Sequence, residues 1–159
     1  MNPASPHPAI LVVDDETMVL VTLRAILERE GYRVATSSSA ADALQVMRRE
    51  EFGVVISDHR MPNMMGLDFL KECRRLRPEC SRVLLTAVLH LKEVMDAISS
   101  GEICRFVSKP WLREELLAAV TDAAQRHELT ARNVALVAET QRLQKLLDEA
   151  RVESARVGV

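Results

Sequence analysis

Short apolar runs alternate with amphipathic stretches along most of this sequence, from residue 9 to about residue 126. The runs predict strands at Ile10–Val13, Arg33–Thr36, Val54–Ser57, Arg82–Thr86 and Arg105–Ser108. Apolar residues spaced three and four apart predict helices near 17–30, 40–50, 64–76, 91–99 and from residue 111 onward. Two of the strands are almost purely apolar, which is typical of central strands in a parallel sheet that helices cover on both faces.

Residues that favour helix ends and turns lie between these elements. Gly31 is placed to end the first helix as its C′ residue, and Ser38 or Ser39 to cap the second helix. Pro62-Asn63 and Pro78 mark loops before the next elements. Five strand–helix units with right-handed crossovers make an α/β fold. We predict a doubly wound five-stranded parallel sheet of flavodoxin-like order 2-1-3-4-5, with a long C-terminal helical extension.

The predicted strands end in polar residues. Asp14 and Asp15 follow the first strand, Asp58 follows the third, Thr86 ends the fourth and Lys109 follows the fifth. Ligands of such sheets bind at the carboxyl ends of the strands, so we expect these side chains to meet there. Carboxylates supply the hard oxygen ligands that Mg²⁺ prefers, and an ammonium and a hydroxyl complement phosphoryl oxygens. The pattern predicts a divalent-metal and phosphoryl site.

The last predicted helix differs from the others, because neither Gly nor Pro occurs from Trp111 to Val157. Its early apolar residues have the spacing of a face packed on the sheet. Later residues form a heptad seam: Leu129, Leu136, Leu143 and Ala150 recur every seven residues, with Asn133, Thr140 and Leu147 between them. A buried Asn in such a seam favours a parallel, in-register dimer at some cost in stability. We predict a coiled-coil homodimer; the alternative is a solvated tail that is partly helical.

Composition removes several classes of function. The formal net charge is −2, and the tail mixes acidic and basic residues, so we expect no nucleic acid to bind this chain. No apolar stretch is long enough for a membrane span, and the first residues do not resemble a secretory signal, so we expect a cytoplasmic protein without membrane contact. The three cysteines show no CxxC spacing and are expected to be reduced.

Taken together, Asp14-Asp15, Asp58, Thr86 and Lys109-Pro110 resemble the CheY-like receiver domain of two-component response regulators. The segments Asp58-x-x-Met61-Pro62-x-x-x-Gly66 and Phe106–Pro110 resemble the same family. The resemblance implies that Asp58 accepts a phosphoryl group from a sensor histidine kinase. It also implies that Asp14, Asp15, Asp58 and the backbone carbonyl of Arg60 hold Mg²⁺ (or Mn²⁺), and that Lys109 pairs with a phosphoryl oxygen. The Lys109–Pro110 peptide bond is cis in the family.

The resemblance further implies a conformational switch. Thr86 would donate its hydroxyl to the phosphoryl group, coupled to rotation of the aromatic residue Phe106. The helix at 91–99, the strand Arg105–Ser108 and the last helix would then shift as one face. Phe106 has no hydroxyl, so only the burial part of this mechanism is available. Arg60 departs from the small or amide residues that are common at its position, and we predict that it tunes the lifetime of phosphorylated Asp58.

These observations divide the chain into a disordered lead-in at 1–8, a receiver domain at 9–126 and an extension of the last helix at 127–159. The receiver would control an output domain or partner through its dimer contacts, without being an enzyme beyond self-phosphorylation and autodephosphorylation at Asp58. The alternative is a receiver-shaped dimerisation module that phosphorylation does not regulate. A phosphohydrolase of the haloacid-dehalogenase type needs a second Asp two residues after its nucleophile, which neither Asp14 nor Asp58 has.

Overall fold

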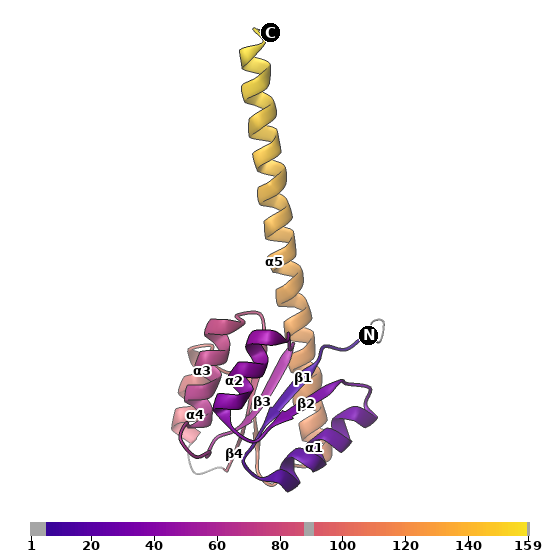
Figure 1. Ribbon diagram of the computed structural model, residues 1–159, viewed down its shortest axis with the longest axis vertical. Helices are drawn as coiled ribbons and strands as arrows, with labels where there is room; N and C mark the ends of the chain where they lie inside the picture. The colour runs from indigo at the N-terminus through magenta and orange to yellow at the C-terminus, as the bar shows by residue number, and fades with distance from the viewer. Residues whose placement is uncertain (1–5, 88–90, 159) are drawn as a thin grey trace. The chain divides into compact units, whose positions relative to one another are not determined.

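The computed structural model describes residues 6–87 and 91–158, and its centre is a parallel sheet of the predicted topology (Figure 1). The strands are β1 (Ile10–Val13), β2 (Val34–Ser37), β3 (Val54–Asp58), β4 (Ser81–Thr86) and β5 (Arg105–Ser108). They pair in the order β2-β1-β3-β4-β5, as the sequence predicted. The strand order reverses between β1 and β3, so the crevice at the carboxyl ends of these two strands is the switch point where such sheets bind ligands.

The helices alternate with the strands. They are α1 (Thr17–Arg29), α2 (Ala40–Arg49), α3 (Gly66–Leu76), α4 (Leu91–Ser99) and α5 (Arg113–Arg156). Each lies within two residues of its predicted bounds where a bound was given. His90, which the pattern places at the start of α4, lies outside the described residues.

Two apolar clusters, one on each face of the sheet, hold these layers together. Alternate residues of β1 point to opposite faces, so Ile10 and Val12 join the cluster of α1 and α5, whereas Leu11 and Val13 join that of α2, α3 and α4. All four side chains are fully buried, which explains why this strand has no polar alternate positions. Helices therefore pack on both faces of the sheet and hold its carboxyl edge in place.

Two predicted helix ends are confirmed. Gly31 adopts a positive φ of 91°, and the amides of Gly31 and Tyr32 donate to the carbonyls of Glu28 and Leu27, which is the Schellman arrangement. At the start of α2, the Ser39 hydroxyl accepts a hydrogen bond from the Asp42 amide at 3.2 Å. Of the predicted lead-in at 1–8, residues 1–5 lie outside the described part, and the His7 ring lies 4.7 Å from that of Tyr32.

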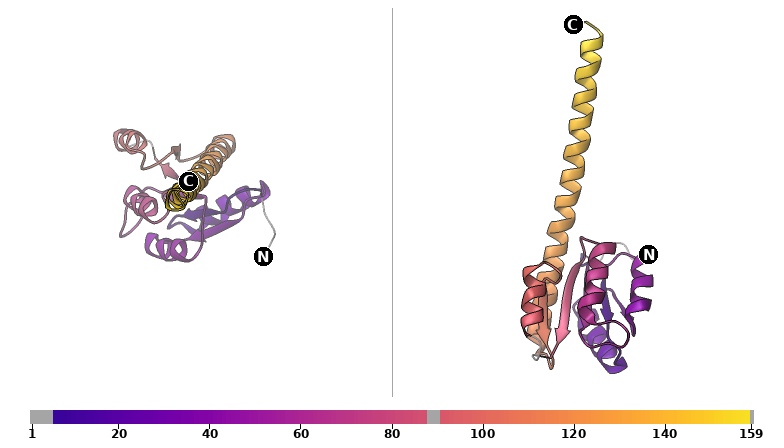
Figure 2. Two further views of the ribbon diagram at one scale, coloured as in Figure 1. Left: turned by 90° about the horizontal axis from the view of Figure 1, so that it is seen from above. Right: turned by 90° about the vertical axis from the view of Figure 1, so that its left-hand side faces the viewer.

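The chain divides into two compact units, which we call the receiver unit (Met1–His127) and the extension unit (Glu128–Val159). Figure 2 draws α5, which contributes to both, as one unbroken helix. In the extension unit, all residues of the predicted dimer seam are exposed: Leu129, Asn133, Leu136, Thr140, Leu143, Leu147 and Ala150. Among residues 6–87 and 91–158, no helix combines the length and apolarity that crossing a membrane requires.

Candidate functional site

The strand register brings the predicted acidic residues together. Val13 of β1 pairs with Ser57 of β3, so Asp14 and Asp58 follow side by side at the carboxyl edge. Carboxylate oxygens of Asp14, Asp15 and Asp58 all lie within 4.8 Å of one another. Asp14 is completely buried, Asp58 is nearly so, and Asp15 is exposed. Two of the three charges are therefore held in poor contact with water.

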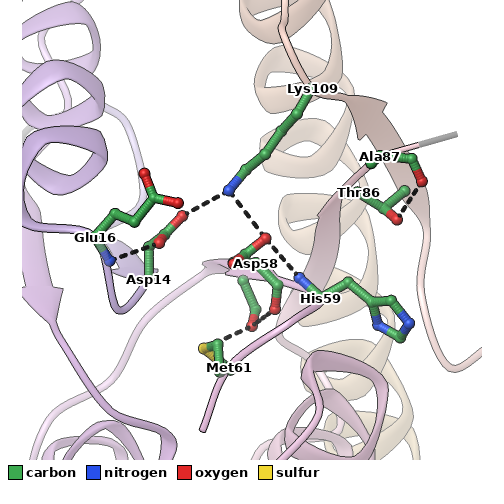
Figure 3. Close-up of polar contacts among 9 residues, drawn as sticks. Asp14, Glu16, Asp58, His59, Met61, Thr86, Ala87 and Lys109 are labelled. Carbon is green, nitrogen blue, oxygen red and sulfur yellow. Dashed lines mark hydrogen bonds and ion pairs between the residues drawn. The ribbon is translucent and has the colours of Figure 1, made fainter.

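Lys109 reaches this cluster from β5. Its Nζ lies 2.9 Å from Asp58 Oδ1 and 3.0 Å from Asp14 Oδ2, so the ammonium bridges the two buried carboxylates (Figure 3). Its backbone amide donates to the Thr86 carbonyl at 2.9 Å, which fixes the end of β5 beside that of β4. The peptide bond from Lys109 to Pro110 is cis, as the family resemblance implied.

Burial and charge act in opposite directions on the pKa values of these groups. Burial raises the pKa of the Asp14 carboxyl above its ordinary value, although hydrogen bonds from the Glu16 amide and Lys109 oppose this shift. Burial also acts against the charge of Lys109, but its hydrogen bonds to Asp58 and Asp14 outweigh that effect and raise its pKa. Three carboxylates face one ammonium, so the cluster keeps an excess of negative charge. A divalent cation would compensate for that excess.

The loop after β3 presents backbone groups to Asp58. The His59 amide donates to Asp58 Oδ1 at 2.9 Å, so this residue contacts the predicted phosphoacceptor through its backbone. The Gly66 amide donates to the His59 carbonyl at 2.7 Å. A side chain at position 66 would collide with the Asp58 carbonyl and the His59 backbone, so the close return of the loop requires glycine.

Thr86 and Arg60 line the same cleft as Asp58. This cleft has a volume of about 260 Å³, and it is lined by Asp15, Glu16, Asp58, His59, Arg60, Thr86, Ala87 and Lys109. The Thr86 hydroxyl donates to the Ala87 carbonyl at 2.9 Å. Figure 3 shows that this hydroxyl is directed to its own loop. Thr86 is therefore close to the site in this structure but bonded elsewhere.

Two features of the site were not predicted from the sequence. Glu16 lines the cleft, and its amide donates to Asp14 Oδ1 at 2.9 Å. Glu16 is also the N-cap of α1, and its side chain makes no capping bond. The His59 ring lies beside Glu93 of α4, with 3.7 Å between Nε2 and Oε2. The acidic triplet Asp14-Asp15-Glu16 could have indicated that Glu16 lines the cleft. The approach of His59 to Glu93 depends on tertiary packing.

Comparison with known proteins decides the family. The family model of the response regulator receiver domain matches residues 10–121, which is most of the chain. The chain belongs to the response regulator receiver family. Its site carries the acidic cluster, the threonine and the lysine at the strand ends where the sequence resemblance placed them. The receiver unit extends six residues beyond the end of the matched segment, to His127.

Similar proteins include longer regulators. The hydrogenase transcriptional regulatory protein HoxA of Cupriavidus necator is 34% identical over 120 residues, which are 76% of this chain and 25% of that protein. The alginate biosynthesis transcriptional regulatory protein AlgB of Pseudomonas aeruginosa is 37% identical over 133 residues, 84% of this chain and 29% of that protein. This chain thus spans between a quarter and a third of these two relatives.

A solved structure supports the same fold assignment. The signal receiver domain of an HD domain-containing protein from Pseudomonas fluorescens superposes with a TM-score of 0.74 and 34% identity, covering 83% of this chain and 98% of that one. The similar proteins thus include transcriptional regulatory proteins and an HD domain-containing protein.

Proposed function

We propose that this receiver accepts a phosphoryl group on Asp58 from a sensor histidine kinase, in a reaction that requires Mg²⁺ or Mn²⁺. The observation that carries the proposal is the cluster itself, in which three carboxylates converge within 4.8 Å and a single lysine bridges two of them. A set of acids with no metal would repel one another, and such a cluster costs stability unless a cation uses it. The receiver-shaped module without phosphorylation gives no reason for this arrangement.

Each residue of the receiver would have a defined task. Asp58 attacks the phosphorus, so an O–P bond forms while the P–N bond of the donor phosphohistidine breaks and the imidazole leaves. Asp15, Asp58 and the Arg60 carbonyl would hold the metal directly, and Asp14 through a bound water. When bound, Mg²⁺ supplies positive charge against the phosphoryl oxygens. Lys109 would exchange its present contact with Asp58 for a phosphoryl oxygen, because its ammonium is already beside that carboxylate.

The switch would begin at Thr86. Phosphorylation adds strong acceptor oxygens at Asp58, and the Thr86 hydroxyl would leave the Ala87 carbonyl to donate to one of them. Phe106, half-buried against the cluster of α2, α3 and α4, would move into the space that Thr86 leaves. The face formed by α4, β5 and α5 would then change. Phosphorylation favours the conformation in which Thr86 donates to the new acceptor, so a charge added at Asp58 changes the face formed by α4, β5 and α5.

Arg60 would set how long the phosphorylated state lasts. Its side chain is exposed, and the residue lines the cleft that contains Asp58. A guanidinium there can cover the phosphoryl group and limit the approach of water. We expect Arg60→Ala and Arg60→Asn to change the rate of dephosphorylation by a few-fold to roughly tenfold, about 1 kcal/mol in the barrier. Equal rates in wild type and both variants would show that Arg60 has no such role.

The output of the receiver would be a change in homodimer contacts along the extension of α5. The exposed seam of leucines, with Asn133 and Thr140 as polar positions, supports this proposal because a second copy would cover it. A receiver that is a known dimer is also similar to this one. The structure of the beryllofluoride-activated NtrC4 receiver domain dimer has a TM-score of 0.70 and 28% identity, over 75% of this chain and 98% of that one.

Phosphorylation of Asp58 can be tested directly. The chain is incubated with acetyl phosphate and Mg²⁺, and with beryllofluoride and Mg²⁺, and its intact mass and oligomer size are measured. We expect a phosphoryl adduct on wild type and none on Asp58→Asn, with an adduct retained on the exposed control Asp68→Asn. Wild type without an adduct, or an equal adduct on Asp58→Asn, would refute the proposal. An adduct that leaves oligomer size and extension contacts unchanged would refute the dimer output alone.

A further inference from the structure

Helix α4 is held differently at its two ends. Helix α4 buries two of its described residues, Val94 and Ala97. Helix α3 buries four: Gly66, Phe69, Leu70 and Cys73. A cleft of about 570 Å³ lies between α3 and α4, with Leu67 and Lys71 on one wall and Glu93 and Asp96 on the other. A helix with little buried apolar surface depends on its end contacts for its position.

The carboxyl end of α4 is fixed by arginine side chains. Arg82, a buried residue of β4, donates from Nε to the Glu102 carbonyl at 2.7 Å and from Nη2 to the Gly101 carbonyl at 3.1 Å. Its third bond, from Nη1 to the Cys80 carbonyl at 2.6 Å, ties the same guanidinium to the loop before β4. Arg74 of α3 adds a bond to the Ser100 carbonyl at 3.2 Å. Charge-assisted bonds from a buried guanidinium are strong, so this end is anchored to the sheet.

The amino-terminal half of α4 has a weaker contact, and it leads directly to the phosphoacceptor. The Glu93 carboxylate lies 3.7 Å from Nε2 of His59, and the Glu93 side chain is 62% exposed. The His59 ring is almost fully buried, and the amide of the same residue donates to Asp58 Oδ1. Figure 3 shows the His59 ring directed away from Asp58. One residue therefore contacts Asp58 through its backbone and α4 through its ring.

We propose that His59 is a positioning residue that couples Asp58 to α4, which pivots about its Arg82-anchored end. The inference rests on the proposed function, because it assumes that Asp58 is modified. A phosphoryl group on Asp58 would change the acceptor of the His59 amide, and a shift of that backbone would take the ring out of its contact with Glu93. The amino-terminal half of α4 then loses a contact while residues 100–102 stay in place. This route acts in addition to Thr86 and Phe106.

Hydrogen–deuterium exchange of the whole chain, with and without beryllofluoride and Mg²⁺, tests the coupling. Glu93→Gln removes the charge that faces His59, and Asp96→Asn is a matched control on the same helix and the same cleft. Without beryllofluoride, we expect Glu93→Gln to speed exchange in residues 91–96 by about 1.5- to 5-fold, the range for loss of an exposed charge contact. Exchange at 100–103 should not change, and Asp96→Asn should behave as wild type.

The same measurement separates this inference from the proposed function. Beryllofluoride should accelerate exchange at 91–96 in wild type, and much less in Glu93→Gln, where the contact is already absent. Glu93→Gln should have much less effect on this segment when it is added to His59→Ala, since the contact that it removes is then already absent. Equal behaviour of Glu93→Gln and Asp96→Asn, or additive effects of the pair, would overturn the inference even when the mass shift at Asp58 is normal. A missing mass shift would instead refute the proposed function.

Discussion

The two parts of α5 are helical for different reasons. In the receiver unit, the helix buries Leu116, Ala119, Val120, Ala123 and Ala124, which recur on one face and pack against β1, β3 and α1 in a single cluster. In the extension unit, every described residue is exposed except Ala131, which is half-buried. The first part is specified by packing. The second part has the sequence of a helix but no described surface of its own unit to pack on.

Local contacts in the extension unit do not compensate for this difference. Arg132 pairs with Glu128, Arg142 with Glu139, and Gln144 with Asp148, each one turn away along the helix. Pairs of this kind contribute about 0.2–0.5 kcal/mol each to an isolated helix. These contributions are small, so we predict that a partner covering the apolar seam stabilises the helix of the extension unit. A continuous helix can therefore depend on different contacts in its two parts.

The largest expected effect comes from removing matching leucines in the two parts. Leu116→Ala should lower the free energy of unfolding of the receiver unit by about 2–5 kcal/mol, because Leu116 is fully buried and leaves a cavity. Leu143→Ala should leave the unfolding of the receiver unit unchanged, because Leu143 is exposed, and should weaken self-association instead. Urea unfolding followed by tryptophan fluorescence, from Trp111 beside the receiver cluster, measures the first effect.

Sedimentation equilibrium measures the association of the same two variants. Similar losses of receiver stability in both would mean that the two parts of α5 share one source of stability, contrary to the comparison. No loss of association in Leu143→Ala would remove Leu143 from the dimer seam.

Metal binding should act on the receiver unit alone. With Mg²⁺ at a hundred times its dissociation constant, the unfolding free energy of the receiver should rise by about 2.7 kcal/mol. The acidic cluster that would hold the ion belongs to this unit, so the helix content of the extension should not respond. Asp15→Asn should abolish most of the gain. Thermal unfolding with Mg²⁺ and with EDTA provides the measurement, and an equal gain in Asp15→Asn would exclude this cluster as the site.

The same contrast between packed and exposed parts explains what the sequence could predict. The apolar strand Ile10–Val13 and the acidic residues at the strand ends were sufficient to predict the topology. Once the sheet is parallel, the register of β1 and β3 brings Asp14 beside Asp58. The Arg82 bonds to three carbonyls and the approach of His59 to Glu93 were not predictable, since each joins loops or helices whose relative position no periodic pattern encodes. The seam of the extension remains a prediction, because its partner would be another chain.

Asn133 offers a sharper test of the exposed part. If the seam is a parallel dimer, Asn133→Leu should replace a polar layer with an apolar one and tighten association roughly tenfold or more, about 1.4 kcal/mol. The same substitution should reduce the preference for one parallel dimer, so larger oligomers or other helix registers should appear. Sedimentation velocity and cysteine cross-linking at position 136 would detect both effects. Unchanged association would favour the solvated tail that the sequence left as the alternative.

The smallest expected effect concerns the charge of Asp14 in the packed receiver. Burial raises the pKa of Asp14 above its ordinary 3.8, so the ionised carboxylate is disfavoured in the folded state. This penalty is absent below pH 3.8, where the carboxyl is protonated folded or unfolded, and complete above the raised folded pKa. With EDTA present, Asp14→Asn should therefore stabilise the receiver at pH 7. The gain should be less than about 1 kcal/mol, because Lys109 loses one of its two carboxylate partners and this loss opposes the gain. The gain should vanish at pH 3.5. Urea unfolding of both proteins at the two pH values measures it, and a variant that is less stable at pH 7 would mean that the bond to Lys109 outweighs the cost of burying the charge.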